Sequence, residues 1–306
     1  MKVTNKYNLP EPVVKSLSHD AYDRGESNRS VTQLIDSPRI SVLRRQHDEE
    51  MSEDVSQKLW SVLGTAVHNM FEKGAEDTDF ISEQRWFTSH DGGWRISGAI
   101  DLVEVNDKAK TITVSDYKCT SVWSVIYEKQ EWHNQLNAYA WLLRHTEMEP
   151  DPLEEEHRYF PDYAVNKLQI IAVLRDWKEN DLKRNGGNYP KAPIMVIDIP
   201  TWSTEEQDRY MEERIALHDE AEYAYLTGGR LPACSEKEQW AKPEKFALHK
   251  GTAKRATRVF DDLSEAQKYM KGTDLTLVRR AGDKTRCTAN WCGVNEWCDQ
   301  YEKESK

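Results

Sequence analysis

The chain has 306 residues with a formal net charge of −11, and 38% of the residues are hydrophobic. The 11 Trp, 13 Tyr and 6 Phe residues exclude wholesale disorder, and no window approaches the 18 consecutive apolar residues of a transmembrane helix. We expect a cytoplasmic protein without a membrane span or an export signal. The chain is long enough for two domains of ~150 residues each.

The first ordered elements are expected after a polar segment. Residues 1–29 are charge-mixed and predict an arm with at most short helices. Ser30 is placed to cap one short helix, and Pro38 to open a second. Residues 55–75 carry apolar side chains at helical spacing, so an amphipathic helix is predicted there; these are Val55, Leu59, Val62, Leu63, Val67, Met70 and Phe71.

The central part of the chain predicts a mixed β-sheet flanked by helices. Three strands, over 80–88, 94–105 and 111–119, are joined by short polar segments suited to hairpins. A long helix is predicted over 124–145, followed by an acidic surface excursion over 148–162. The apolar run 168–174 indicates a buried central strand.

The last part of the chain predicts a loop, a strand, a long helix and a small α+β extension. These are expected over 180–193, over 194–199, and from the capping pair Ser203 and Glu206 to Leu226. Short strands over 246–249, 256–260 and 275–279 are predicted around a helix at 265–270. The fold class is therefore α/β, and the expected domains are an arm (1–29), a core (30–228) and a cysteine-containing extension (229–306).

One predicted helix and the three strands that follow it each carry charged residues that are candidates for a common site. His68 and Glu72 share one face of the helix over 55–75, Glu83 lies in the first strand and Asp101 in the second. Asp116 and Lys118 are two apart in the third strand, so their side chains project to the same side. Charges beside a buried strand face are costly unless they pair or bind a cation. A purely structural Asp116–Lys118 ion pair is one interpretation, and a catalytic site is the other.

The order of these motifs resembles the PD-(D/E)xK nuclease superfamily, and within it the RecB-like exonuclease group that includes many phage nucleases. The matching segments are GTAVH with His68, Glu83, GAID ending at Asp101, DYK from Asp116 to Lys118, and QLNAY from Gln135 to Tyr139. Two positions depart from the pattern. Ser115 stands where proline is usual, and Tyr117 occupies the second acidic position, so Asp101 must supply the other carboxylate.

The resemblance implies a restriction-endonuclease-like core and metal-dependent hydrolysis of DNA. Asp101, Asp116, the backbone carbonyl of Tyr117 and the imidazole of His68 would bind Mg²⁺ or Mn²⁺, which suits carboxylate oxygens and one imidazole. Lys118 would orient the attacking water, and Glu83 would bind a second ion or hold a water. Gln135 and Tyr139 would position the DNA backbone, or else serve only in helix packing.

Four of the five cysteines lie after residue 230, and in a chain without an export signal they favour metal ligands, catalytic groups or core thiols over disulfides. Some RecB-like proteins close the nuclease domain with a four-cysteine [4Fe–4S] cluster. By that resemblance Cys234, Cys287, Cys292 and Cys298 would bind iron–sulfur, although the spacing of the last three differs from the usual one. Zinc and no metal at all stay open as alternatives. Cys119 follows Lys118 and is expected to be an ordinary strand residue.

The expected function is a Mg²⁺- or Mn²⁺-dependent exodeoxyribonuclease acting in recombination, repair or replication. A phage origin is expected from the resemblance, and the location would then be the host cytoplasm. A restriction-type endonuclease and a noncatalytic DNA-binding protein are the alternatives. DNA is the expected partner, with a recombination or single-strand-annealing protein as a further candidate. No nucleotide motor is expected, since the nearest segment to a phosphate-binding loop, at 281–285, lacks its glycine spacing. Lys250, Lys254, Arg255 and Arg258 are expected to contact DNA phosphates.

Overall fold

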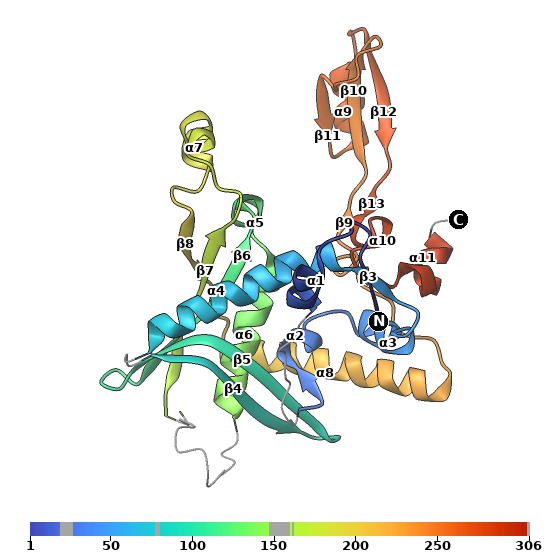
Figure 1. Cartoon of the computed structure of the whole chain (residues 1–306). Coiled ribbons are helices and arrows are strands. Elements are labelled where there is room, and N and C mark those ends of the chain that lie inside the picture. Colours follow the sequence, from blue (N-terminus) through green and yellow to red (C-terminus); the bar gives the residue numbers. More distant parts are fainter. Residues whose placement is uncertain (19–26, 77–79, 147–159, 161, 305–306) are drawn as a thin grey trace. The chain divides into compact units, whose positions relative to one another are not determined.

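A computed structural model describes residues 1–18, 27–76, 80–146, 160 and 162–304 (Figure 1). The chain forms two compact units, the first from residues 1–35 and 48–219, the second from residues 36–47 and 220–306. The predicted division into arm, core and extension stays a prediction. Among the helices described, none is both long enough and apolar enough to cross a membrane.

The first unit is built on a mixed sheet, which confirms the predicted fold class. Long β5 pairs antiparallel with β4 along one edge; on its other edge it pairs with β2 near its start and with β6 near its end. Strand β6 continues parallel to β7, and β7 pairs antiparallel with β8. The strands are β2 (Arg29–Ser30), β4 (Ile81–His90), β5 (Trp94–Asn106), β6 (Thr111–Thr120), β7 (Ala164–Leu174) and β8 (Ile194–Ile199).

Helix α6 (Gln130–His145) covers one face of this sheet and supplies much of the core. Its Leu136 and Leu142 are fully buried. Close packing depends on Gly98 of β5, because a Cβ atom there would lie 2.9 Å from side-chain atoms of both Tyr139 and Leu142. The glycine of the GAID motif therefore lets α6 approach the strand that carries Asp101.

Helix α4 (Leu59–Ala75) forms within the range predicted for the amphipathic helix, with Val62, Val67 and Phe71 half-buried. None of its residues is fully buried, and Leu59, Leu63 and Met70 are exposed. The helix packs against β4 and β6 of the sheet and follows the short helix η1 (Val55–Lys58). Helix α4 therefore packs on the sheet through one narrow row of half-buried side chains. Its other apolar side chains face solvent.

Local structure differs from the expectation at three further places in the first unit. The helix predicted over 124–145 is divided into α5 (Val122–Ile126) and α6, with Glu128 between them at a positive φ of 23°. The loop expected over 180–193 contains α7 (Glu179–Asn185) and η2 (Gly186–Asn188). The N-terminal segment holds α1 (Glu11–Ser18) and also a strand, β1 (Lys2–Thr4), paired with β3 (Ser52–Asp54). Most of the excursion at 148–162 lies outside the described residues.

Helix caps agree with the sequence patterns. Ser30 caps α2 (Val31–Leu34) in a reciprocal arrangement with Gln33. Ser203 and Glu206 form the predicted capping box of α8 (Thr204–Thr227), since each backbone N–H donates to the other's side chain. Pro38 opens α3 (Pro38–Gln46) in the second unit as predicted, and Val42 and Leu43 of this helix are buried.

The second unit contains α3, the end of α8 and a C-terminal α+β part. A three-stranded antiparallel sheet in the order β11-β10-β12 packs against α9. Residues 245–280 carry nine Lys and Arg against four Asp and Glu, in a chain that is acidic overall. The elements are β9 (Ala241–Lys242), β10 (Lys245–Lys250), β11 (Arg258–Phe260), α9 (Leu263–Met270), β12 (Leu275–Arg280), β13 (Asp283–Lys284), α10 (Thr285–Thr288), η3 (Asn295–Trp297) and α11 (Asp299–Glu304).

Candidate active site

Three side chains from three elements of the first unit converge where β4 and β5 pair. His68 comes from α4, Glu83 from β4 and Asp101 from β5. His68 Nδ1 lies 3.0 Å from Oε1 of Glu83 and 3.5 Å from Oδ1 of Asp101. One ligand atom from each residue lies within 4.8 Å of the other two. This group has the composition and the spacing of a metal-binding site.

Glu83 reaches the group from an unusual backbone conformation. Its φ is +50° in the middle of β4, a region that disfavours residues with a Cβ atom. The flanking residues keep their register, with Ser82 opposite Leu102 and Gln84 opposite Ile100, so Glu83 stands across from Asp101. Such strain costs about 1–3 kcal/mol and gathers at functional sites.

The backbone of Tyr117 adds an acceptor to this group. Its carbonyl oxygen lies 3.2 Å from Nε2 of His68, and its N–H donates to Oδ2 of Asp101 at 2.6 Å. The Tyr117 ring packs edge-on against His68 and Phe71 of α4. The segment DYK thus presents its backbone carbonyl, and not the tyrosine hydroxyl, to the group.

Asp116 and Lys118 form a second, adjoining arrangement. Lys118 Nζ lies 2.6 Å from Oδ2 of Asp116, an oxygen that makes no hydrogen bond of good geometry, while Oδ1 accepts one from Gln135 at 3.0 Å. Gln135 also donates to the hydroxyl of Tyr139 at 2.9 Å. Asp116 and Tyr139 are buried. These bonds account for Gln135 and Tyr139 within the fold, and DNA contact by either residue stays a prediction.

Burial and neighbouring charges shift the pKa values of two residues of the site. Burial and the neighbouring charge of Asp116 raise the pKa of Asp101 to about 8. Burial alone would lower the pKa of His68, but the hydrogen bond to Glu83 and the nearby charges of Asp101 and Asp116 raise it. Several carboxylates crowded in a desolvated space favour either protonation or a bound cation.

The residues present fit a hard divalent cation. Carboxylate and carbonyl oxygens with one imidazole are a donor set for Mg²⁺ or Mn²⁺. Of the predicted ligands, His68, Asp101 and the Tyr117 carbonyl lie together, and Glu83 joins them. Asp116 contributes its charge but is not in the three-residue group. Glu72, which shares a helix face with His68, is exposed, and the carboxylate beside His68 comes from Glu83 of β4.

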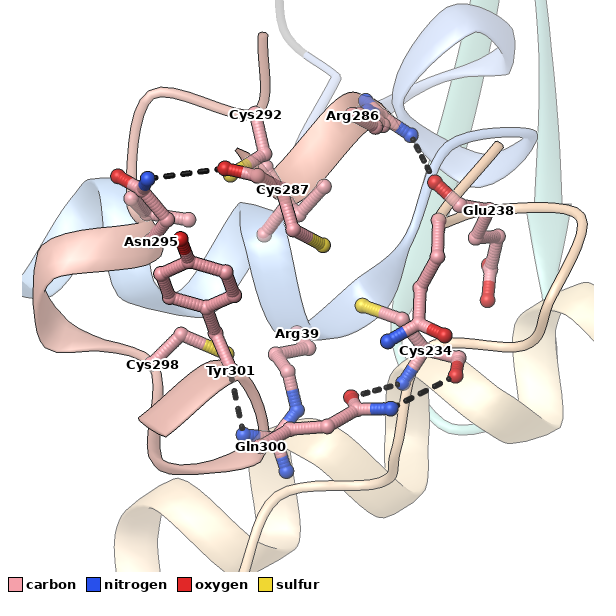
Figure 2. A pocket seen from close by; sticks show the side chains of 13 residues that line it. Arg39, Cys234, Glu238, Arg286, Cys287, Cys292, Asn295, Cys298, Gln300 and Tyr301 are labelled. Atoms are coloured by element: carbon pink, nitrogen blue, oxygen red, sulfur yellow. Dashed lines mark hydrogen bonds between the residues drawn. The ribbon is translucent and has the colours of Figure 1, made fainter. Parts of the chain in front are cut away.

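A pocket in the second unit gathers all four C-terminal cysteines (Figure 2). Cys234, Cys287, Cys292 and Cys298 line it, and none of the five cysteines forms a disulfide. No three of the sulfur atoms in the described chain lie within 4.8 Å of one another. Burial raises the pKa of the Cys234 thiol to about 11. Cys119 lies in β6 of the first unit, as expected of a strand residue.

Side chains that the sequence did not single out hold this pocket together. Ser37 Oγ lies 3.1 Å from the sulfur of Cys234, and Gln300 exchanges two hydrogen bonds with the Cys234 backbone. Arg39 is fully buried, forms an ion pair with Asp299, and directs Nη1 toward the sulfur of Cys298 at 3.9 Å. Nothing in the spacing of these residues could have indicated contacts with cysteines that lie 66 to 259 positions away in the sequence.

Comparison with known proteins agrees with the site. No curated protein matches the chain. A solved structure described as "Crystal structure of SSO0001" shares 18% identity and a TM-score of 0.43, covering 68% of this chain and 85% of that one. The sequence model of the PD-(D/E)XK nuclease superfamily matches residues 42–299, which include every residue of the candidate site. The chain therefore belongs to the PD-(D/E)XK nuclease superfamily.

Proposed function

We propose that the protein is a metal-dependent nuclease that hydrolyses DNA phosphodiester bonds. The observation that carries this proposal is the convergence of His68, Glu83 and Asp101 beside the Asp116–Lys118 pair. A bound Mg²⁺ or Mn²⁺ would neutralise charge on the phosphate and lower the pKa of a water molecule. His68, Asp101, Glu83 and the Tyr117 carbonyl would hold the ion, with Asp116 as a further ligand once Lys118 engages the phosphate.

Each remaining side chain has a role that follows from its contacts. Lys118 is partly exposed, so its ammonium can reach a phosphate and stabilise negative charge as the bond to the attacking water forms. Asp116 holds Lys118, and Gln135 fixes Asp116 through its Oδ1 atom. Glu83 lies 3.0 Å from Nδ1 of His68, so its carboxylate would fix the orientation of the imidazole as well as offer an oxygen to the ion.

Within this activity we propose an exonuclease acting at DNA ends in recombination, repair or replication, on the resemblance to RecB-like enzymes. The test uses end-labelled linear DNA and a covalently closed circle of the same sequence, each with Mg²⁺ or Mn²⁺. Progressive loss of the linear substrate with the circle spared supports the proposal. Nicking or linearisation of the circle would assign a restriction-type endonuclease. Binding without cleavage under any metal would identify a noncatalytic DNA-binding protein.

We also propose that the cysteine pocket holds a [4Fe–4S] cluster as a structural cofactor. Four thiolates suit either an iron–sulfur cluster or tetrahedral zinc. The choice of iron–sulfur rests on the resemblance to RecB-like proteins that close the nuclease domain with a four-cysteine cluster. Ser37 and Arg39 add polar contacts to two sulfurs, which is how proteins stabilise cluster thiolates. Hydrolysis needs no electron transfer, so the group would serve to fold the second unit.

A further inference from the structure

Three large aromatic side chains of the first unit are exposed near the end of the strand that carries Asp116 and Lys118. Trp60 is 51% exposed, Trp123 58% and Tyr127 74%. Trp60 lies in the first turn of α4, the helix whose apolar residues are not fully buried. Trp, Tyr and Arg are enriched among the residues that contribute most to binding at interfaces.

The chain connects these aromatic residues directly to the site. Strand β6 ends at Thr120, and Ser121 caps α5, so Trp123 follows Lys118 by only five residues. At the same end of the sheet, the Arg175 N–H donates to the Thr120 carbonyl at 3.0 Å. Asp176 accepts hydrogen bonds from Ser121 and from the Val122 N–H, which fixes α5 to the end of β7.

Arg175 links the two groups of aromatic residues. Its guanidinium lies 4.4 Å from the ring centroid of Trp60, and its backbone is bonded to the strand that leads into α5. The ring of Trp123 in α5 stacks on the ring of Tyr127, the residue directly after this helix, with centroids 6.0 Å apart and planes 16° apart. Trp60 precedes His68 by eight residues on α4, a separation of about 12 Å along the helix axis.

The chemistry of this surface suits an unpaired nucleic acid strand. Each base has two flat faces that stack on an indole or phenol ring, and Arg175 adds a positive charge for a phosphate. Lys129 and Lys178, each within three residues of Tyr127 or Arg175, are also exposed. In a duplex the base faces are already stacked on one another. Flat aromatic faces beside a phosphodiester-cleaving centre therefore select an open strand.

We infer that Trp60, Trp123, Tyr127 and Arg175 form an aromatic platform on which unpaired bases stack as a single-stranded DNA end enters the site. This inference deepens the proposed nuclease function and rests on it. The substrate bound in position for cleavage would then be single-stranded DNA or a duplex end whose strands have separated.

The test measures binding of fluorescein-labelled oligothymidine and of a blunt hairpin duplex by anisotropy, in EDTA so that neither is cleaved. Trp60→Leu and Trp123→Leu keep an apolar side chain but remove the flat ring, whereas Trp123→Tyr restores one. Tyr223→Leu replaces an exposed aromatic residue of α8 in the second unit and is the matched control. Circular dichroism checks that each variant is folded.

The Leu variants should bind oligothymidine about 5- to 150-fold more weakly, the range expected for one lost base–aromatic contact. Duplex binding should be unchanged, Trp123→Tyr should recover most of the affinity, and Tyr223→Leu should match the unsubstituted protein. Equal oligothymidine affinity in all variants would overturn the platform. Loss of self-association in the Leu variants, with oligothymidine binding unchanged, would also overturn it and assign the surface to a second copy. Failure of the nuclease proposal is a separate result, namely no cleavage by the unsubstituted protein with Mg²⁺ or Mn²⁺.

Discussion

Nδ1 of His68 lies 3.0 Å from a carboxylate oxygen of Glu83, although the two residues come from a helix and a strand and are 15 positions apart. Glu83 makes this contact from a backbone with a positive φ of 50° in β4. The fold thus maintains a strained residue where a histidine, two buried aspartates and a lysine meet. A purely structural ion pair between Asp116 and Lys118 would need neither the strain nor the histidine.

Removing the imidazole should weaken the metal site without emptying it. In His68→Ala, two carboxylates and the Tyr117 carbonyl remain, so we expect the Mn²⁺ concentration for half-maximal cleavage to rise at least about 10-fold. Mn²⁺ should be affected more than Mg²⁺, because it accepts nitrogen ligands more readily. Metal titrations of cleavage rate measure this. Glu72→Gln, one turn further along α4, is the control, and identical titrations for His68→Ala would place the histidine outside the site.

Asp101 should make the metal-free protein less stable as the pH rises. Its pKa of about 8 lies above the usual carboxyl value, so the folded state binds a proton that the unfolded state loses near pH 4. Folding is therefore favoured less and less between about pH 4 and pH 8. In EDTA, Asp101→Asn should raise the midpoint of urea unfolding at pH 8 more than at pH 5.

The exposed Asp91 provides the comparison for that experiment. Asp91→Asn should shift the unfolding midpoint equally at both values of pH. We expect the charged, buried carboxylate of Asp101 to lower the free energy of unfolding at pH 8. An unfolding midpoint for Asp101→Asn below that of the unsubstituted protein at pH 8 would contradict this expectation.

The cysteine pocket makes a spectroscopic prediction. Protein purified without oxygen should be brown, with absorption at about 400 nm from thiolate-ligated iron. Cys292→Ser should lose the colour and unfold at a lower temperature, because a thiolate-bound metal supplies folding energy. Cys119→Ser, in the other unit, should keep both. A colourless preparation with one zinc per chain would reassign the pocket, and one with neither metal would leave four ordinary thiols.

The basic loop between β10 and β11 should add salt-dependent affinity. Lys254 and Arg255 lie in this loop, whereas the Arg258 guanidinium lies over the rings of Phe260 and Tyr269. Replacing Lys254 and Arg255 with alanine should weaken DNA binding and reduce the slope of log affinity against log salt by about 2. Lys108→Ala, in the β5–β6 hairpin, is the control. An unchanged slope would remove this loop from the DNA contacts.

The sequence was most informative where periodicity and chemistry agreed. Short polar segments between three strand candidates predicted the hairpins of β4, β5 and β6, and with them the neighbourhood of Asp101, Asp116 and Lys118. It was least informative where tertiary contacts decide. Burial of α4 depends on how much of the sheet the helix covers, and the contact of His68 with Glu83 depends on a strained backbone that no local pattern encodes. The meeting of Cys234 with cysteines more than 50 residues away likewise requires the fold.

The central claim is that Asp116 and Lys118 belong to a hydrolytic site and are not merely an ion pair. The most direct measurement compares cleavage of end-labelled DNA by the unsubstituted protein, Asp116→Asn, Lys118→Ala and Lys167→Ala, with circular dichroism on each. We predict that Asp116→Asn and Lys118→Ala remain folded but cleave at least about 100-fold more slowly, the cost of removing one electrostatic contact in a transition state. Lys167→Ala, which removes an exposed lysine of β7, should leave the rate unchanged. Near-normal cleavage by folded Asp116→Asn or Lys118→Ala protein would contradict the account.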